Sequence, residues 1–145
     1  MKSDNYVKLE FPSRSVNESL ARTAVAGFAA QMDPTLDELG DIRTAVSEAV
    51  TNAIVHAYPD AVGTVWLRAR IIDGEFLEIV VKDKGRGIED VKKAMEPLFT
   101  TAPEEERSGL GFSVMESVMD RLTVKSQPGK GTTVTMRKRL KVHGG

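Results

Sequence analysis

The chain has 145 residues, enough for one domain with a substantial core, and its 20 Lys and Arg nearly balance 21 Asp and Glu. No global charge therefore draws it to nucleic acid or to an anionic membrane. The absence of cysteine excludes disulfides and thiolate metal sites, and no apolar run has the length of a signal peptide core or a membrane span, so we expect a single cytoplasmic domain without either partner.

The N-terminal segment is predicted to form a strand and then a helix. Residues 6–11 alternate in polarity and are followed by Pro12, as is typical of a strand at the edge of a sheet. Ser15 has Glu18 three residues later, which is the spacing of a capping box. We therefore expect a helix that begins here and continues to Met32.

Residues 36–58 carry the clearest helical pattern in the sequence. Asp33 is expected to cap this helix, and Pro34 fits its first turn. Glu48 and Asn52 lie one turn apart on the polar face, so a carboxylate and a carboxamide share one side. Alone, such a pair is an ordinary feature of a solvated helix. The opposite face is apolar and consists of Leu39, Ile42, Val46, Ala49, Val50, Ala53 and Ala57.

A β-hairpin is predicted to follow this helix. Residues 64–72 and 75–83 are rich in β-branched and apolar residues, and Asp73-Gly74 between them is a strong signal for a tight hairpin turn. Trp66 is the only tryptophan, and a place in the core or on a sheet face is favoured over stacking on a cofactor.

The second hairpin strand ends at Asp83, within the segment DKGRG. Gly85 and Gly87 permit positive φ and a close approach to the backbone. A plain turn explains this short motif at least as well as a ligand site does. The position of this motif directly after a strand therefore says more about a possible ligand site than its residue types do.

The remaining sequence alternates between loop and regular structure. A short helix is plausible at residues 89–95, whereas residues 97–108 lose all periodicity, and we expect them to form a lid. Gly109-Leu110-Gly111 then opens a helix at residues 112–119, whose N-terminal amides could face an anion. The last predicted elements are strands at residues 121–126 and 132–140, joined by a turn at residues 127–131.

Five segments, SEAVTNAIVHAY, DKGRG, LFTT, RSGLGF and GKGTTV, resemble in order and spacing the ATP-binding domain shared by gyrase, heat-shock chaperones, mismatch-repair ATPases and histidine kinases. Each motif is weak alone, but the resemblance covers residues 36–134 and is specific as a set. It implies the two-layer α/β sandwich of that superfamily, the Bergerat fold, with helices on one face of a mixed, mostly antiparallel sheet.

Within that superfamily, the chain most resembles the stand-alone serine kinases that serve as bacterial anti-sigma factors, especially those that act on sporulation sigma factors of the sigma-F type. Its length of one bare domain, the segment SEAVTNAIVHAY and the short PLFTTAPEEERSGLGF segment carry this resemblance. It implies inhibition of a sigma factor, ATP-dependent phosphorylation of an anti-anti-sigma protein, and a homodimer through residues 15–32 and the edge strand. A general stress-response anti-sigma kinase and a nucleotide-switched binding module without kinase activity remain alternatives.

The resemblance also implies roles for individual residues. Asn52 would place an oxygen on Mg²⁺, whose other ligands come from water and the phosphates of ATP. Glu48 would act as the general base that accepts the proton of a serine hydroxyl. Asp83 would accept a hydrogen bond from the adenine amino group, with Gly85 and Gly87 giving the base room.

The phosphates of ATP would be held by the second glycine motif. Gly109 and Gly111 would contribute with neighbouring amides, and Arg107 would meet the γ-phosphate or the substrate protein in a catalytic role. The other residues expected to contact the nucleotide here are Thr100, Thr101, Ser108 and Leu110.

Four further residues complete the expected site and its surroundings. Thr132 or Thr133 would complete the adenine pocket, and Arg22 is a candidate contact to the sigma factor. His56 lies near the edge of the polar helix face, where structural packing is favoured over catalysis.

Overall fold

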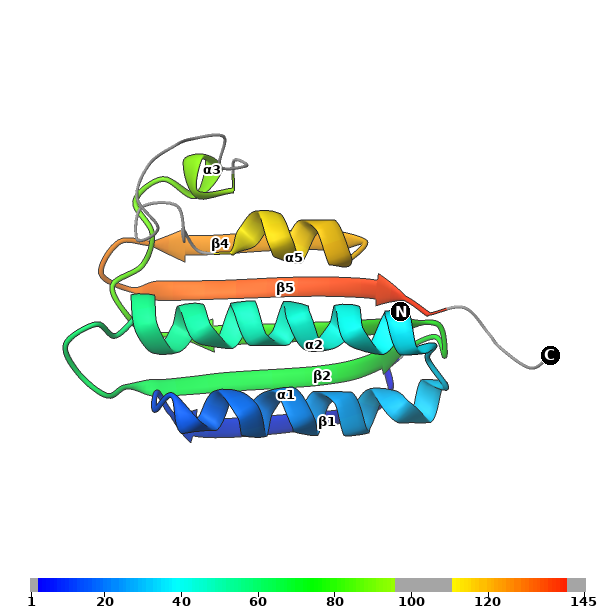
Figure 1. The fold of residues 1–145 in the computed structure, drawn as a ribbon. Helices are drawn as coiled ribbons and strands as arrows, with labels where there is room; N and C mark the ends of the chain where they lie inside the picture. The colour runs from blue at the N-terminus through cyan, green and yellow to red at the C-terminus, as the bar shows by residue number, and fades with distance from the viewer. Residues whose placement is uncertain (1–2, 96–110, 141–145) are drawn as a thin grey trace.

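A computed structural model describes residues 3–95 and 111–140, and it shows a five-stranded sheet with helices against one face (Figure 1). The strands are β1 (Ser3–Pro12), β2 (Thr64–Ile72), β3 (Phe76–Asp83), β4 (Arg121–Gln127) and β5 (Gly131–Arg139). The helices are α1 (Val16–Ala29), α2 (Leu36–Thr51), α3 (Val91–Ala94) and α5 (Phe112–Val118). This arrangement confirms the expected two-layer α/β sandwich.

The strand order is β1-β2-β3-β5-β4. A mixed, mostly antiparallel sheet was expected, and each of the four pairings in the described chain is antiparallel. β1 lies at the edge, as predicted, but it begins at Ser3 and includes Pro12, which pairs with Thr64. Because an edge strand has one unpaired side, it tolerates the missing amide of proline.

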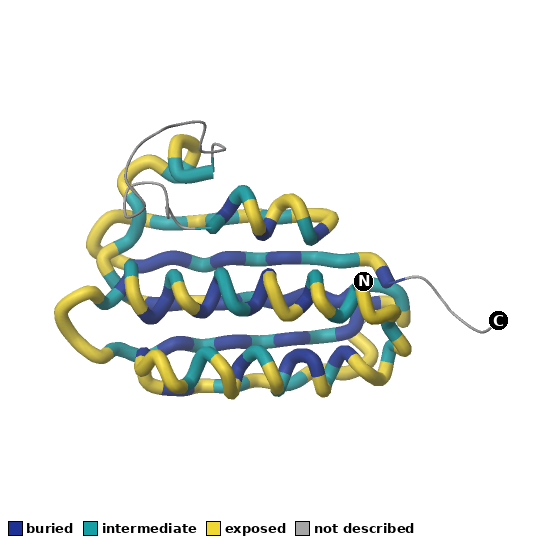
Figure 2. The backbone as a smooth tube through the Cα atoms, viewed as in Figure 1, coloured by how far each residue is buried: buried dark blue, intermediate teal, exposed yellow. Residues whose placement is uncertain are grey.

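Strand β2 shows how the sheet divides its two faces. Val65, Leu67 and Ala69 are buried beneath the helices, whereas Trp66 and Arg68 alternate with them on the opposite face. Figure 2 shows the same alternation of buried and less buried positions along the strands. Burying one such large aliphatic side chain contributes about 1.5–3 kcal/mol. The helices supply the other half of this core through Ala21, Val25, Ile42, Val46, Val50 and Met115.

The β2–β3 hairpin forms as the sequence predicts. Asp73 and Gly74 both have positive φ, at 55° and 66°. This pair of left-handed residues matches the right-handed twist of the flanking strands. The turn sets the register in which Ile72 pairs with Phe76.

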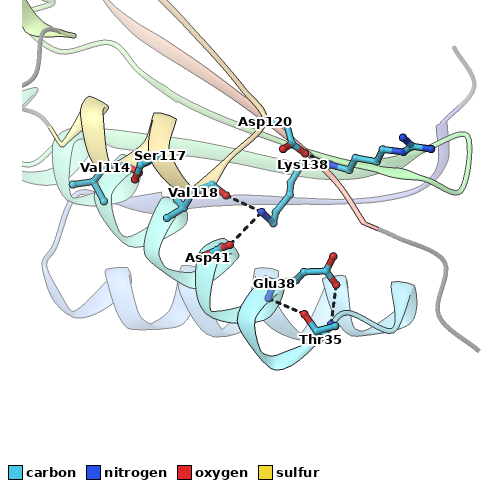
Figure 3. Close-up of polar contacts among 9 residues, drawn as sticks. Thr35, Glu38, Asp41, Val114, Ser117, Val118, Asp120 and Lys138 are labelled. Carbon is cyan, nitrogen blue, oxygen red and sulfur yellow. Dashed lines mark hydrogen bonds and ion pairs between the residues drawn. The ribbon is translucent and has the colours of Figure 1, made fainter.

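The two helix starts in the N-terminal half differ from the prediction. Ser15 makes no capping hydrogen bond, because its backbone is already helical at φ −58° and ψ −29°. Thr35 is extended at φ −70° and ψ 167°, and it forms a complete capping box with Glu38 (Figure 3). A side chain can reach back to the third helical amide only from such an extended residue. Asp33 is likewise not the cap of α2, since it adopts the left-handed conformation that ends the preceding 3₁₀ turn.

Lys138 joins one strand of the sheet to two elements of the helical layer. It projects from β5, and its Nζ donates to the Val118 carbonyl at 2.8 Å and lies 3.3 Å from Asp41 Oδ2 (Figure 3). Val118 is the last residue of α5, where the helix dipole favours a cation, and Asp41 belongs to α2. The contact therefore fixes α5 and α2 to the same strand.

Among the described residues, no helix is both long and apolar enough to cross a membrane.

Candidate functional site

A cavity of about 410 Å³ opens beside the C-terminal half of α2 and the end of β3. Asn52 and Ala49 line it from the helix, Asp83 from β3, and Thr132 from β5. Phe112, at the start of α5, adds an apolar wall. Polar groups from three elements of the fold thus converge on one partly apolar cavity, which is the usual form of a small-molecule site.

The last part of the helix predicted at residues 36–58 is not α-helical. Residues Asn52–His56 form a π-helical turn, in which the amide of Ala57 donates to the Asn52 carbonyl at 2.9 Å. Single π turns within helices are frequent at functional sites. Asn52 and His56, at the two ends of this turn, both line the cavity. Burial lowers the pKa of His56, and the positive charge of Arg86 lowers it further, so this imidazole is neutral near pH 7.

Asp83 is a buried carboxylate in the cavity wall, with 6% of the residue exposed. Its Oδ1 accepts hydrogen bonds from the amides of Gly85 at 2.9 Å and Thr132 at 3.2 Å. Burial raises the pKa of Asp83, and these two amides lower it in part. Two backbone groups therefore orient a strong hydrogen-bond acceptor beside the cavity.

Gly85 and Gly87 serve the protein's own packing. A methyl group at Gly85 would overlap the carbonyl of Ala57, and one at Gly87 would overlap the carbonyl of Gln127. Gly87 also has φ +75°. The resemblance implied that these glycines give a bound base room, which stays a prediction; Gly87 lines the cavity, and backbone fills the space that a side chain would need at both positions. Their absent side chains let the DKGRG segment pack against Ala57, directly after the π turn, and against the β4–β5 turn.

Thr132 belongs to a hydroxyl network that sequence reasoning did not find. Its Oγ1 lies 2.8 Å from Ser126 Oγ, which also accepts from the amide of Ile88 at 2.8 Å and donates to the Gly131 carbonyl at 3.0 Å. Since Ser126 has one proton to donate, Thr132 is the donor between the two hydroxyls. Thr133 lies on the other face of β5 and is not among the lining residues of the cavity.

Glu48 is half-buried on α2, and burial raises the pKa of its carboxyl. It does not line the cavity itself, but it lies one helical turn before Asn52, which does. Gly111, the residue before α5, packs so closely that a side chain there would overlap the Glu48 carboxylate. The predicted Glu48–Asn52 pair therefore lies where α2, α5 and the cavity meet.

Metal binding at this site would depend on a ligand that brings its own oxygens. Within residues 3–95 and 111–140, no cluster of three His, Asp or Glu side chains could hold a metal ion. The amide oxygen of Asn52 is a suitable single ligand for a hard cation such as Mg²⁺. Asn52 together with phosphate oxygens therefore fits Mg²⁺, whereas an all-protein metal site does not.

Arg22 lies apart from this cavity, and several expected nucleotide contacts are outside the described residues. Arg22 is on α1, with 41% of its side chain exposed, and pairs with Glu18 at 3.7 Å. The expected lid at residues 97–108 lies outside the described residues. So do six expected site residues, namely Thr100, Thr101, Arg107, Ser108, Gly109 and Leu110.

The sequence and the fold are similar to known proteins over nearly the whole chain. Residues 11–138 match the family described as histidine kinase-like ATPase domain. A protein of Caldanaerobacter subterraneus subsp. tengcongensis named anti-sigma F factor is 59% identical over 138 residues, which cover 95% of this chain and 96% of that protein.

Two solved structures have a similar fold at low sequence identity. The structure of the RsbU and RsbW domains of Rv1364c from Mycobacterium tuberculosis aligns with a TM-score of 0.70 and 19% identity, over 94% of this chain and 32% of that one. The catalytic domain of the histidine kinase ThkA aligns with a TM-score of 0.58 and 15% identity, over 92% of this chain and 98% of that one. At these identities, the likeness concerns the fold alone.

Proposed function

Because the chain belongs to the histidine kinase-like ATPase domains and, within them, to the anti-sigma F factors, we propose that it binds and inhibits a sporulation sigma factor of the sigma-F type. As an ATP-dependent serine kinase, it would also phosphorylate and inactivate an anti-anti-sigma protein in the cytoplasm. The single observation that best supports the nucleotide chemistry is the buried Asp83, held by two amides in the wall of a cavity of about 410 Å³.

The cavity has the groups needed to hold ATP and Mg²⁺. Asp83 would accept a hydrogen bond from the adenine amino group, a contact that water competes with only weakly because the carboxylate is buried. The base would lie near Thr132 and against the apolar wall at Phe112. Asn52 would supply one oxygen to Mg²⁺, which would neutralise charge on the phosphates.

Glu48 is proposed as the general base. A carboxylate oxygen of Glu48 would accept the proton of the substrate serine hydroxyl. The serine oxygen would attack the γ-phosphorus of ATP as the bond between the γ-phosphorus and the leaving ADP oxygen breaks. Burial raises the pKa of this carboxyl, which makes the ionised form a better proton acceptor at neutral pH. Arg107 and the segment at residues 108–111 would contact the phosphates, as the family pattern implies.

Partner binding is proposed for the α1 and β1 side of the molecule. Arg22 is half-buried on α1 and would contact the sigma factor, while α1 and the edge strand β1 would form a homodimer surface. Val16 and Leu20, one turn apart on α1, are 74% and 56% exposed, which is consistent with a covered surface in an assembly.

The proposed function can be tested with three purified proteins. The chain is mixed with the sporulation sigma factor and the anti-anti-sigma protein of its source cell, in ATP or in ADP. Phosphoserine is then identified by mass spectrometry, and sigma binding is measured by size-exclusion chromatography. We expect sigma binding and ATP-dependent serine phosphorylation. Sigma binding without phosphorylation would favour the alternative of a nucleotide-switched binding module without kinase activity. Absence of sigma binding would overturn the proposal.

A further inference from the structure

The sheet has a second face, opposite to the helices, that carries most of its charged side chains. Helices α1, α2 and α5 all pack on the first face, and none of the described helices covers the second (Figure 1). The register of the five strands places residues of this second face in rows across the sheet. Each row contains lysine or arginine.

The first row is built around one buried carboxylate. Glu78 on β3 is 3% exposed and lies between Arg70 of β2 and Arg137 of β5. Its Oε1 accepts from Arg70 Nε at 2.7 Å, and its Oε2 accepts from Arg137 Nε at 2.8 Å. Arg68 Nη2 approaches the same carboxylate at 3.3 Å, and Arg121 stands beside Arg137 on β4. One negative charge thus faces several positive charges.

Two further rows on this face also carry positive charge. Lys8 pairs in register with Arg68 in the second row, and Lys82 is an exposed residue of the third. Glu10 is the only acid of these two rows, and its Oε1 accepts a hydrogen bond from Trp66 Nε1 at 2.6 Å. The chain as a whole has a net charge of −1, so this face concentrates positive charge.

A groove of about 560 Å³ crosses this face between β1, β2 and β3. Its apolar part comes from Trp66 and Val80, and lysines line its sides. The ammonium group of Lys84 lies 5.3 Å from the centre of the Trp66 ring. We term this surface the basic groove; its lining includes one acid, Glu10, which bonds to Trp66, and we define the groove by Lys8, Glu10, Trp66, Arg68, Val80, Lys82 and Lys84.

We propose that the basic groove binds an acidic polypeptide segment of a partner protein. Carboxylate side chains of such a segment would pair with its lysines and Arg68, and an apolar side chain would contact Trp66 and Val80. A second copy packed face to face through this groove would place like charges opposite each other. Nucleic acid is disfavoured because Lys84 lies over the Trp66 ring, where a base would stack.

This surface lies on the opposite side of the sheet from the nucleotide cavity, so the inference goes beyond the proposed function and can fail independently. Thr132 and Asp83 point to the helical side, while Lys82 and Thr133 alternate with them on the other. Binding in the groove should therefore be the same with and without ATP.

The test uses a fluorescein-labelled peptide of glutamates with one central leucine, titrated with the full chain and followed by fluorescence anisotropy. Quenching of Trp66, the only tryptophan, reports contact at the groove itself. Lys82→Glu reverses one exposed charge in the groove, and Arg43→Glu makes the same change on exposed α2, in the helical layer. A labelled oligothymidylate and sedimentation velocity test the two other occupants.

We expect the peptide to bind, to be released as salt is raised, and to change Trp66 fluorescence. Lys82→Glu should weaken binding by about tenfold or more, while Arg43→Glu should leave it within about twofold. The proposal is overturned if the peptide does not bind at low salt, or if both variants weaken binding equally. Tighter binding of the oligothymidylate, or self-association that Lys82→Glu alone changes, would also overturn it by assigning the groove to nucleic acid or to a second copy.

Discussion

Gly111 lies directly against the carboxylate of Glu48, so that even a methyl group at Gly111 would overlap Glu48 Oε2. Gly111 precedes α5 and has φ +68°, while Glu48 belongs to α2. The position of the proposed base, Glu48, therefore depends on the missing side chain of Gly111, which lies just before another helix. The overlapping atom is the end of a flexible side chain, so it can move aside.

Gly111→Ala should displace this carboxylate and leave the chain folded. A side chain at positive φ costs about 1–2 kcal/mol, and moving a catalytic group by about 1 Å lowers a rate by up to about 10²-fold. We expect phosphoryl transfer to fall by between about tenfold and 10²-fold, measured by single-turnover kinetics. Gly74→Ala is the control, because it has the same strain at φ +66° but no close contact. Equal activity of both variants would show that the contact does not position Glu48.

Asp83→Asn separates nucleotide binding from stability. Asparagine keeps an oxygen for the amides of Gly85 and Thr132 but loses the charged acceptor proposed for adenine. We expect ATP affinity, measured by calorimetry, to fall by at least about tenfold, since a hydrogen bond to a charged group contributes about 1.5–3 kcal/mol. Unchanged affinity would remove Asp83 from the adenine site.

The pKa of Asp83 sets the sign of the stability effect. Burial raises its folded pKa above the ordinary 3.8, so the folded state holds the proton to higher pH than the unfolded state does. Stability due to this group is therefore greatest at low pH and falls as pH rises from the ordinary value through the folded pKa. At pH 7 the buried charge is destabilising. Asp83→Asn should accordingly have an equal or higher Tm than the native chain at pH 7, and a lower one would contradict this account.

Glu48→Gln should separate binding from chemistry. The substitution keeps the size of the side chain and removes the base, so ATP affinity should stay within about twofold while serine phosphorylation falls by about 10²–10⁴-fold. Because burial raises the pKa of Glu48, the native rate should rise with pH through that pKa, and the variant should lack this acidic limb. A native rate or an unchanged pH profile in the variant would exclude Glu48 as the base.

The strands and the DKGRG motif could be predicted because their signals are local. The alternation of apolar residues in 64–72 and the Asp73-Gly74 turn together fix the hairpin and its faces. The motifs containing Asn52 and Asp83 could be compared with a family, and the structure places both at one cavity. Pattern was sufficient for the hairpin because its two strands and its turn are neighbours in the sequence.

Other features depend on contacts that the sequence does not display. The pattern S/T-x-x-E occurs at Ser15 and at Thr35, and only the backbone before each helix decides which one caps. Ser126 reaches Thr132 through the β4–β5 register, and neither residue has a motif that indicates it. The π turn that begins at Asn52 follows from hydrogen bonds one residue longer than those of an α-helix, for which residue spacing gives no signal.

Thr35→Ala and Ser15→Ala test the corrected helix caps directly. The Thr35 hydroxyl oxygen accepts from the amide of Glu38 at 3.1 Å, and the Thr35 amide donates to Glu38 Oε1 at 2.8 Å. Loss of such a cap costs about 1 kcal/mol, so Thr35→Ala should lower the free energy of unfolding by about that amount. Ser15→Ala should change it by less than about 0.5 kcal/mol, since no side-chain bond is lost. Urea denaturation measures the free energy of unfolding of both variants. A larger loss for Ser15→Ala than for Thr35→Ala would place the capping box at Ser15 instead.

Glu78→Gln should destabilise the sheet in a pH-dependent way. Burial alone would raise the pKa of Glu78, but hydrogen bonds and charge from Arg70 and Arg137 lower it overall. A depressed folded pKa stabilises the fold above the unfolded value of 4.5, and this contribution is lost as pH falls through the folded pKa. We expect Glu78→Gln to reduce the free energy of unfolding by about 1.5–3 kcal/mol at pH 7, because a buried charged acceptor is removed from its arginines.

The matched control for that experiment is Glu75→Gln. Glu75 also pairs with an arginine, Arg139, but their side chains are 34% and 66% exposed, so the pair contributes at most about 1 kcal/mol. Urea denaturation at a series of pH values from 7 to well below 4.5 should show the stability difference between the native chain and Glu78→Gln holding down to about 4.5 and shrinking below it, as the carboxyl takes up its proton. If the two variants lose equal stability, or if the difference is constant with pH, the arginine cluster does not stabilise ionised Glu78.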